Sequence, residues 1–217
     1  MDQLDPRGAD SAAARRTVTV VSAGLSQPSS TRLLADRLAT ATTDALARRD
    51  VQVEITTIEL RDLAHEITDN LLTGFPAPRL DAAIQAVTRA DGLIAVTPIF
   101  TTSYSGLFKS FIDIIDPQAI ADLPVLLGAT GGTERHSLAI DYAMRPLFTY
   151  LHAVPVPTGV YAASSDWGSA EDALPGRIAR AAEELAALVA ASDRSTRVPD
   201  PFALPDGFSP VGSFGAQ

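Results

Sequence analysis

The sequence predicts an α/β fold in which a parallel β-sheet is covered by helices on both faces. Short β-branched or apolar runs alternate along the chain with segments whose apolar residues recur every three or four positions. The 217 residues are 46% hydrophobic, which is enough to bury one substantial core in one domain. Strict alternation of strand and helix favours parallel strands joined by crossover helices.

Each predicted strand is a short run of apolar or β-branched residues that ends in a polar or glycine-containing turn. The five predicted strands span residues 17–21, 51–55, 93–96, 125–127 and 154–161. We expect the third strand to stop at Pro98, because proline has no amide hydrogen to donate to a neighbouring strand.

The predicted helices lie between these strands and carry apolar residues on one face. They cover the segment after Arg32 and residues 60–72, 79–90, 107–115, 136–151 and 175–191. Pro146 lies inside the fifth of these segments, so we expect a kink there or two abutting helices.

Five strands in this alternation fit a flavodoxin-like three-layer sandwich with strand order 2-1-3-4-5 and a ligand at the switch between the first and third strands. The predicted domain spans residues 17–191. Residues 1–16 are small and polar and are expected to form a disordered lead-in. Residues 192–217 are rich in proline and glycine and are expected to form an extended tail.

Composition restricts the chemistry. The chain has no cysteine, which excludes disulfides, thiolate nucleophiles and cysteine-ligated metals, so any redox chemistry must lie on a bound cofactor. The formal charge of −9 argues against nucleic acid as a partner. No apolar run is long enough to span a membrane, and the first residues do not resemble a signal peptide, so we expect a cytoplasmic protein.

The loop after the first strand suits an anion. It offers hydroxyls and one cation at the start of a helix, where backbone amides attract phosphate, and it lacks both the dinucleotide glycine fingerprint and the Walker lysine. The candidate residues are Ser26, Ser29, Ser30, Thr31 and Arg32. Taken alone, an ordinary hydroxyl cap of the helix is the better explanation.

Two further loops are expected at the same edge of the sheet. After the third strand, Pro98, Ile99, Phe100 and Thr101 offer apolar surface beside free amides, which suits a flat heteroaromatic ring with polar edges. After the fourth strand, the run from Thr130 to Thr133 includes Gly131 and Gly132, which allow the backbone to come close to another group or to form a tight turn.

Three stretches resemble the NADPH-dependent FMN reductase family of flavodoxin-like proteins, and more narrowly the reductases that accompany luciferase-like flavin monooxygenases. They are LSQPSSTRLLA (25–35), TPIFTTSYSGLFKSFID (97–113) and ATGGTERHSLAIDYAMRPLFTYLHA (129–153). The resemblance implies that residues 26 and 29–32 surround the FMN phosphate, that residues 98–101 line the isoalloxazine, and that residues 130–133 approach its edge.

The resemblance implies NAD(P)H:FMN oxidoreduction, with hydride passing from NADPH or NADH to flavin N5 and reduced FMN serving a monooxygenase. Since the flavin carries the hydride, no catalytic side chain is assigned, and no metal site is expected. We expect a homodimer, or a dimer of dimers, formed chiefly through residues 104–115. The alternatives are a flavodoxin-type electron carrier and a flavin-dependent quinone or azo reductase.

Overall fold

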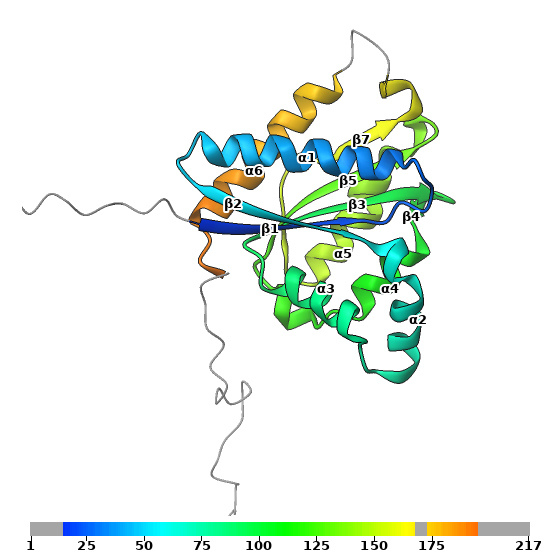
Figure 1. Ribbon diagram of the computed structural model, residues 1–217. Helices are drawn as coiled ribbons and strands as arrows, with labels where there is room; N and C mark the ends of the chain where they lie inside the picture. The colour runs from blue at the N-terminus through cyan, green and yellow to red at the C-terminus, as the bar shows by residue number, and fades with distance from the viewer. Residues whose placement is uncertain (1–14, 168–172, 195–217) are drawn as a thin grey trace, which may run out of the picture.

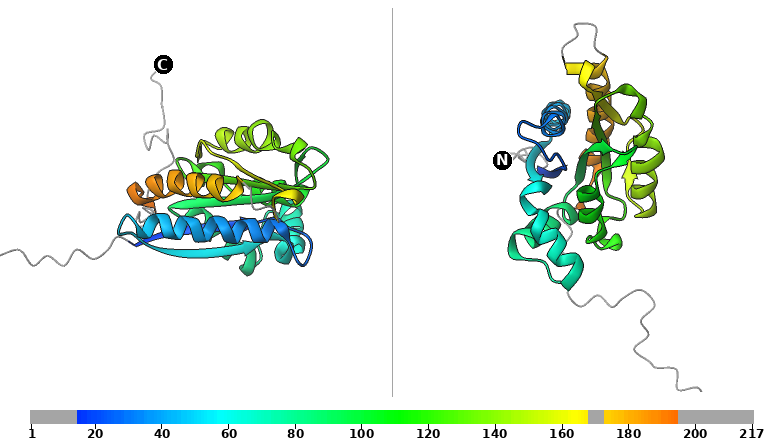
Figure 2. Two further views of the ribbon diagram at one scale, coloured as in Figure 1. Left: turned by 90° about the horizontal axis from the view of Figure 1, so that it is seen from above. Right: turned by 90° about the vertical axis from the view of Figure 1, so that its right-hand side faces the viewer.

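The computed structural model describes residues 15–167 and 173–194 and has three layers (Figure 1). Two long helices, α1 (Ser30–Ala47) and α6 (Leu174–Ala191), cover one face of the sheet (Figure 2). The helices on the other face are α2 (Ala64–Thr73), α3 (Pro78–Thr88), α4 (Gly106–Asp113) and α5 (Arg145–Tyr150). The α/β fold class predicted from the sequence is therefore confirmed.

All the strands except β4 (Ser103–Tyr104) lie in the expected parts of the chain. They are β1 (Arg15–Ser22), β2 (Gln52–Glu59), β3 (Gly92–Phe100), β4 (Ser103–Tyr104), β5 (Pro124–Gly131), β6 (Val154–Pro155) and β7 (Val160–Ala163). The order β2-β1-β3-β5 is parallel throughout, and both β6 and β7 pair with the far edge of β5. The switch point between β1 and β3 lies where the sequence placed it.

The predicted count of five strands is wrong, because the sheet has seven. The expected last strand divides into β6 and β7, since Pro155 and Pro157 cannot supply ladder amides. Side chains bind the intervening backbone instead. Arg145 donates to the carbonyls of Val156 and Pro157, and the Thr158 amide donates to a Glu184 carboxylate oxygen at 2.7 Å.

The third strand also differs from the prediction, since β3 continues past Pro98 to Phe100 and turns back as the antiparallel β4. Pairing of β1 with β3 ends at Ser22 and Val96. The next bond on that side joins the Ala23 amide to the Val96 carbonyl. Successive residues of a strand alternate sides, so the nitrogen of Pro98 points past the end of β1, where no amide is required.

Shorter helical turns complete the connections. They are the 3₁₀ turns η1 (Leu60–Leu63), η2 (Pro117–Ile120), η3 (Glu134–His136) and η5 (Ser164–Trp167), and the π-helical turn η4 (Ile140–Met144). Of the two outcomes expected at Pro146, a kink or two abutting helices, the structure shows the second, because α5 begins at Arg145, directly after η4. None of the helices within the described residues is long and apolar enough to cross a membrane.

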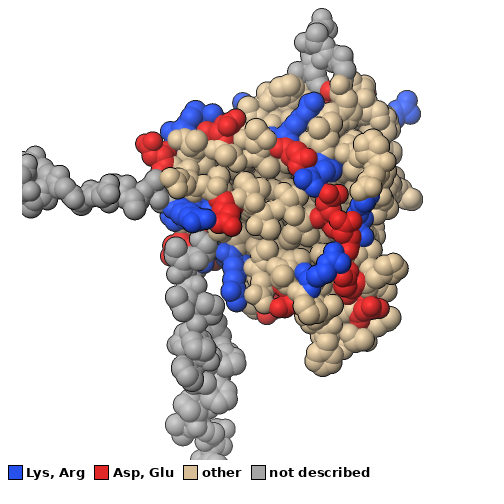
Figure 3. All heavy atoms as spheres, in the orientation of Figure 1, with Lys and Arg blue, Asp and Glu red and all other residues tan. Residues whose placement is uncertain are grey.

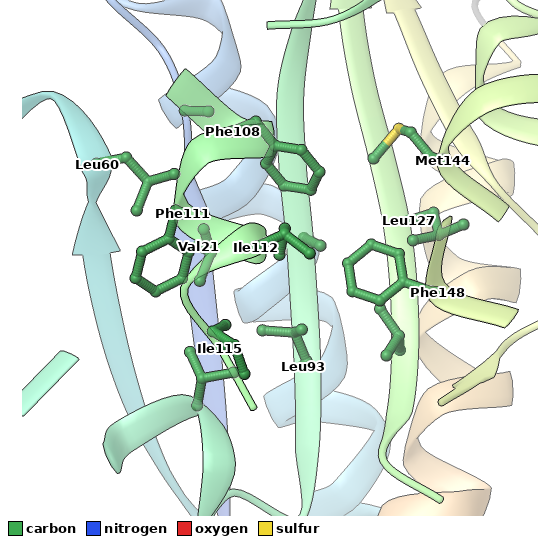
Figure 4. Packing of buried hydrophobic residues seen from close by; sticks show 14 of the residues in the cluster. Val21, Leu60, Leu93, Phe108, Phe111, Ile112, Ile115, Leu127, Met144 and Phe148 are labelled. Atoms are coloured by element: carbon green, nitrogen blue, oxygen red, sulfur yellow. The ribbon is translucent and has the colours of Figure 1, made fainter. Parts of the chain in front are cut away.

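The core has one apolar cluster on each face of the sheet. Figure 4 shows Phe108 and Phe111 of α4 and Phe148 of α5 packed over the side chains of the central strands. The rings of Phe108 and Phe148 meet edge to face, with centroids 6.3 Å apart. Because α4 is anchored in this cluster, the segment that precedes it at the carboxyl edge of the sheet ends at a fixed position.

The boundaries of the predicted domain are only partly covered. Arg15 and Arg16 belong to β1 and not to a lead-in. The rest of the predicted lead-in, residues 1–14, and the tail from residue 195 onward lie outside the described residues.

Candidate functional site

A pocket of about 350 Å³ lies at the carboxyl edge of the sheet, where β1, β3, β5 and β7 end. This volume falls in the range of small-molecule sites. The residues that line it are Leu25, Ser26, Ser30, Thr31, Pro98, Ile99, Phe100, Thr130, Gly131, Gly132 and Ser164. The structure therefore brings all three predicted loops together around one hollow.

The first loop divides its hydroxyls between two tasks. Ser29 is the N-cap of α1, and its hydroxyl accepts from the Arg32 amide at 3.2 Å. Gly24 is required beneath it, because a Cβ there would lie 2.1 Å from that same hydroxyl oxygen. The cap thus uses Ser29, whereas Ser26, Ser30 and Thr31 line the pocket.

A buried hydrogen bond joins the first loop to the fourth strand. The Thr31 and Thr130 hydroxyl oxygens are 2.8 Å apart, and both residues are buried. The bond connects α1 to the end of β5 across the floor of the pocket, between residues 99 positions apart in the chain. The relative position of the helix N-terminus and the glycine loop is therefore fixed by side chains that also line the pocket.

The end of β3 supplies the apolar wall. Ile99 is buried, whereas Phe100 is 49% exposed, and both residues line the pocket. Phe100 pairs with Ser103 across a tight turn made by Thr101 and Thr102, whose φ angles of 48° and 70° are both left-handed. A β-branched residue adopts this conformation rarely. Thr101 itself does not line the pocket.

The glycine loop after β5 is shaped by Tyr161 of β7. The Tyr161 hydroxyl donates to the Thr133 carbonyl at 2.7 Å. A Cβ on Gly131 would lie 2.0 Å from that hydroxyl oxygen, whereas a Cβ on Gly132 would meet nothing within 4 Å. Gly131 is therefore needed for close approach. Thr133 lies outside the pocket lining and caps η3, accepting from the Arg135 amide at 3.4 Å.

Arg32, the cation predicted for the site, forms ion pairs with two carboxylates outside the pocket. Arg32 donates from Nε to Asp36 at 2.8 Å and from a terminal nitrogen to Glu59 at 2.5 Å. The hydrogen bond to Asp36 and the nearby carboxylates raise the pKa of Arg32, against the opposing effect of burial. Arg32 does not line the pocket, and none of the described residues that do is charged. A contact between Arg32 and a ligand stays a prediction.

Sequence reasoning missed Ser164 and Leu25. Ser164 follows β7, whose carboxyl end lies at the same edge as those of β1, β3 and β5. The rule that ligands bind beyond the carboxyl ends of parallel strands could have identified it, if applied to the last strand as well. Its neighbour Ser165 donates to Glu134 at 2.7 Å and so joins this loop to η3.

Arg145 and Trp167 make structural contacts. Arg145 binds Asp141 and the carbonyls between β6 and β7, and Trp167 lies under the guanidinium of Arg37 at 4.9 Å. Within residues 15–167 and 173–194, no group of three or more histidine, aspartate or glutamate side chains is arranged to hold a metal ion.

Comparison with known proteins gives a consistent answer. Residues 16–168 match the sequence profile described as NADPH-dependent FMN reductase. An FMN reductase (NADPH) of Pseudomonas aeruginosa is 37% identical, over 79% of this chain and 91% of that protein. The NADH-dependent FMN reductase SfnF of Pseudomonas fluorescens is 38% identical, over 79% of this chain and 90% of that protein.

Solved structures agree with the sequence comparison. An oxidoreductase from Corynebacterium diphtheriae is 46% identical, covers 82% of this chain and 98% of its own, and superposes with a TM-score of 0.80. The apo form of the NADH:FMN oxidoreductase EMOB is 30% identical, covers 86% and 96%, and gives a TM-score of 0.72. The chain belongs to the NADPH-dependent FMN reductase family.

Proposed function

We propose that this protein is an NAD(P)H-dependent FMN reductase whose flavin binds in the pocket at the carboxyl edge of the sheet. One observation carries the proposal. Three chemically different surfaces converge on that pocket: neutral hydroxyls at a helix N-terminus, an apolar strand end, and a glycine-containing loop. A phosphate, an aromatic ring system and a polar ring edge are the parts of FMN that match these surfaces.

The residues present fit the phosphate end of such a ligand. The first turn of the 18-residue helix α1 contains no acidic residue. Its amides carry partial positive charge, and the hydroxyls of Ser26, Ser30 and Thr31 add neutral donors. These groups would hold the phosphate. Ser29 would act indirectly, because its hydroxyl is used to cap the helix.

The residues also fit a flat ring. Pro98, Ile99 and Phe100 would form the apolar wall, and the backbone of Gly131 and Gly132 would lie at the polar edge. Bound flavin supplies the redox chemistry, since it accepts a hydride from a reduced nicotinamide. The protein's part is to orient the two rings and to exclude water. The half-exposed Phe100 would offer apolar surface to the nicotinamide.

We propose further that reduced FMN leaves the protein to serve a separate monooxygenase. The support is the resemblance of residues 97–113 and 129–153 to reductases of that kind, together with a pocket in which the described lining residues, all uncharged, offer the phosphate no ion pair. If FMN is a released substrate, NAD(P)H and FMN bind together, and double-reciprocal plots intersect. A tightly held flavin that passes electrons to a quinone, an azo compound or a carrier partner would give parallel lines.

We propose that the protein forms a homodimer, through a surface that differs from the one expected from the sequence. The apolar residues Phe108, Phe111, Ile112 and Ile115 are buried in the core of their own subunit, so they do not require a partner. The support now comes from a hollow of about 630 Å³ between α4 and the segment η4 to α5. Tyr142 and Tyr150 lie on it and are each 79% exposed.

The experiment that tests the proposed function is direct. Purified protein is mixed with NADH or NADPH, and the loss of the reduced nicotinamide is followed with and without added FMN. We expect oxidation that requires FMN. No oxidation of either nucleotide with any flavin, by protein whose fold is verified by circular dichroism, would overturn the proposal.

A further inference from the structure

Arg32 lies at the phosphate end of the proposed site but is bound on two sides by carboxylates. It is the basic residue in the first turn of α1, next to Thr31, which lines the pocket. Asp36, one turn further along α1, and Glu59, the last residue of β2, both accept from its guanidinium, at 2.8 and 2.5 Å. The side chains of Arg32, Asp36 and Glu59 are 37%, 49% and 26% exposed.

The charge of this cluster, defined as Arg32, Asp36 and Glu59, is opposite to what an anion site needs. One guanidinium and two carboxylates leave a formal charge of −1 beside the first turn of α1. Figure 3 shows acidic and basic side chains lying next to each other at several places on the face of the molecule that it draws. An approaching phosphate must therefore compete with Asp36 and Glu59 for the same guanidinium donors.

Carboxylate and phosphate oxygens are alternative acceptors for a guanidinium, and both form charge-assisted hydrogen bonds of similar geometry. A phosphate that recruits Arg32 must displace at least one carboxylate and leave it without its partner. The free energy gained from the contact between Arg32 and the phosphate is then largely offset by the free energy lost with the contact between Arg32 and the carboxylate. Solvent around these half-exposed groups weakens the attraction of Arg32 to the phosphate and its attraction to the carboxylates alike. The carboxylates therefore still oppose binding of the phosphate.

We propose that Glu59, with Asp36, competes internally with the flavin phosphate for Arg32 and thereby keeps the affinity for FMN low. This inference rests on the proposed function and deepens it, because it names the residues that favour release of the flavin after reduction. Glu59 is a positioning residue that acts through Arg32. A protein so arranged distinguishes FMN from riboflavin only weakly, although it binds the phosphate end with a helix N-terminus.

The test compares FMN with riboflavin, which lacks the phosphate. Dissociation constants for both flavins are measured by fluorescence quenching for wild-type protein, Glu59→Gln and Asp36→Asn. We expect each variant to bind FMN about two- to fivefold more tightly, the size of effect that half-exposed ion pairs produce. Riboflavin affinity should not change. The gain should shrink as salt is added, because it arises from charge.

Glu66→Gln is the matched control. Glu66 also pairs with an arginine, Arg79, at 3.2 Å, and its side chain is 22% exposed, close to the exposure of Glu59. It lies on α2, outside the pocket lining. Removing its charge should leave the affinity for both flavins as in the wild type. A gain in this variant equal to that of Glu59→Gln would show a general effect of net charge and would overturn the inference.

Arg32→Ala completes the design. In the Glu59→Gln background it should abolish the gain in FMN affinity, whereas in the wild type it should change FMN binding little. Wild-type protein that binds FMN, combined with unchanged or equal shifts for both flavins in Glu59→Gln and Asp36→Asn, refutes the inference and leaves the proposed function standing. Wild-type protein that binds no flavin and oxidises no nicotinamide refutes the proposed function and the inference with it.

Discussion

Replacing Gly131 with alanine should damage both the fold and the flavin pocket, for a reason that can be read from the structure. The new Cβ would lie 2.0 Å from the Tyr161 hydroxyl oxygen and 3.1 Å from the ring carbon that bears it. Contacts this short between non-bonded atoms are not tolerated, so the Tyr161 ring or the β5 backbone must move. Tyr161 is 3% exposed, and it has no free space on the surface into which to turn.

The magnitude follows from the two interactions that the movement disturbs. Overfilling a packed interior costs about 1–3 kcal/mol. Loss of the 2.7 Å bond from Tyr161 to the Thr133 carbonyl adds about 0.5–1.5 kcal/mol. We therefore expect Gly131→Ala to lower the free energy of unfolding by about 2–4 kcal/mol. Since the glycine loop also lines the pocket, FMN affinity should fall as well.

Urea unfolding measures the first effect, and two further variants isolate its cause. Gly132→Ala is the matched control, because its Cβ would meet nothing within 4 Å. Its stability should stay within about 0.5 kcal/mol of the wild type. Tyr161→Phe removes the oxygen that clashes, so adding it to Gly131→Ala should recover part of the lost stability. Equal stability of the two alanine variants, or no recovery by Tyr161→Phe, would refute this account of the loop.

Two other predictions concern the same edge of the sheet. Thr31→Val or Thr130→Val alone should cost about 1–3 kcal/mol in urea unfolding, because each leaves a buried hydroxyl without its partner. The double variant should cost less than the sum; full additivity would argue against the bond. Burial, with smaller contributions from Asp166 and Glu134, raises the pKa of Tyr161 above its ordinary value. Because the fold favours the neutral phenol, this contribution to stability is complete below about pH 10 and is lost as pH rises through the raised pKa. Absorbance titration should show a late tyrosine component that Tyr161→Phe removes, and a late component that survives in that variant would contradict the assignment.

The sequence was sufficient for the arrangement of layers, because each central strand is a compact apolar run and each helix carries an apolar stripe. It was insufficient where non-local contacts decide. Pro98 reads as a strand terminator, yet its nitrogen lies beyond the end of β1, and that depends on the register of another strand. The glycines after β5 indicated a close approach, but only the structure identifies Tyr161 as the approaching group.

The candidate site, too, could be predicted from the sequence only in part. Hydroxyls and glycines at the strand ends could be recognised from the chain alone, because parallel strands bring their carboxyl ends to one edge. Of the two carboxylates that bind Arg32, Glu59 could not be recognised, since it comes from β2, 27 positions away, and no spacing rule connects it to Arg32, whereas Asp36 lies four positions along the same helix. The prediction that Arg32 binds the phosphate rested on its positive charge. It did not take account of Asp36 and Glu59, the two carboxylates that bind Arg32.

The most direct test of the account is the turnover of purified wild-type protein with NADPH and NADH in the presence and absence of FMN. The account predicts that reduced nicotinamide disappears only when FMN is present, and that FMN is reduced in equal amount. It also predicts that Gly131→Ala, where folded, needs more FMN than Gly132→Ala for the same rate. Folded wild-type protein that oxidises neither nucleotide with FMN, or variants with equal FMN requirements, would contradict the assignment of this pocket to the flavin.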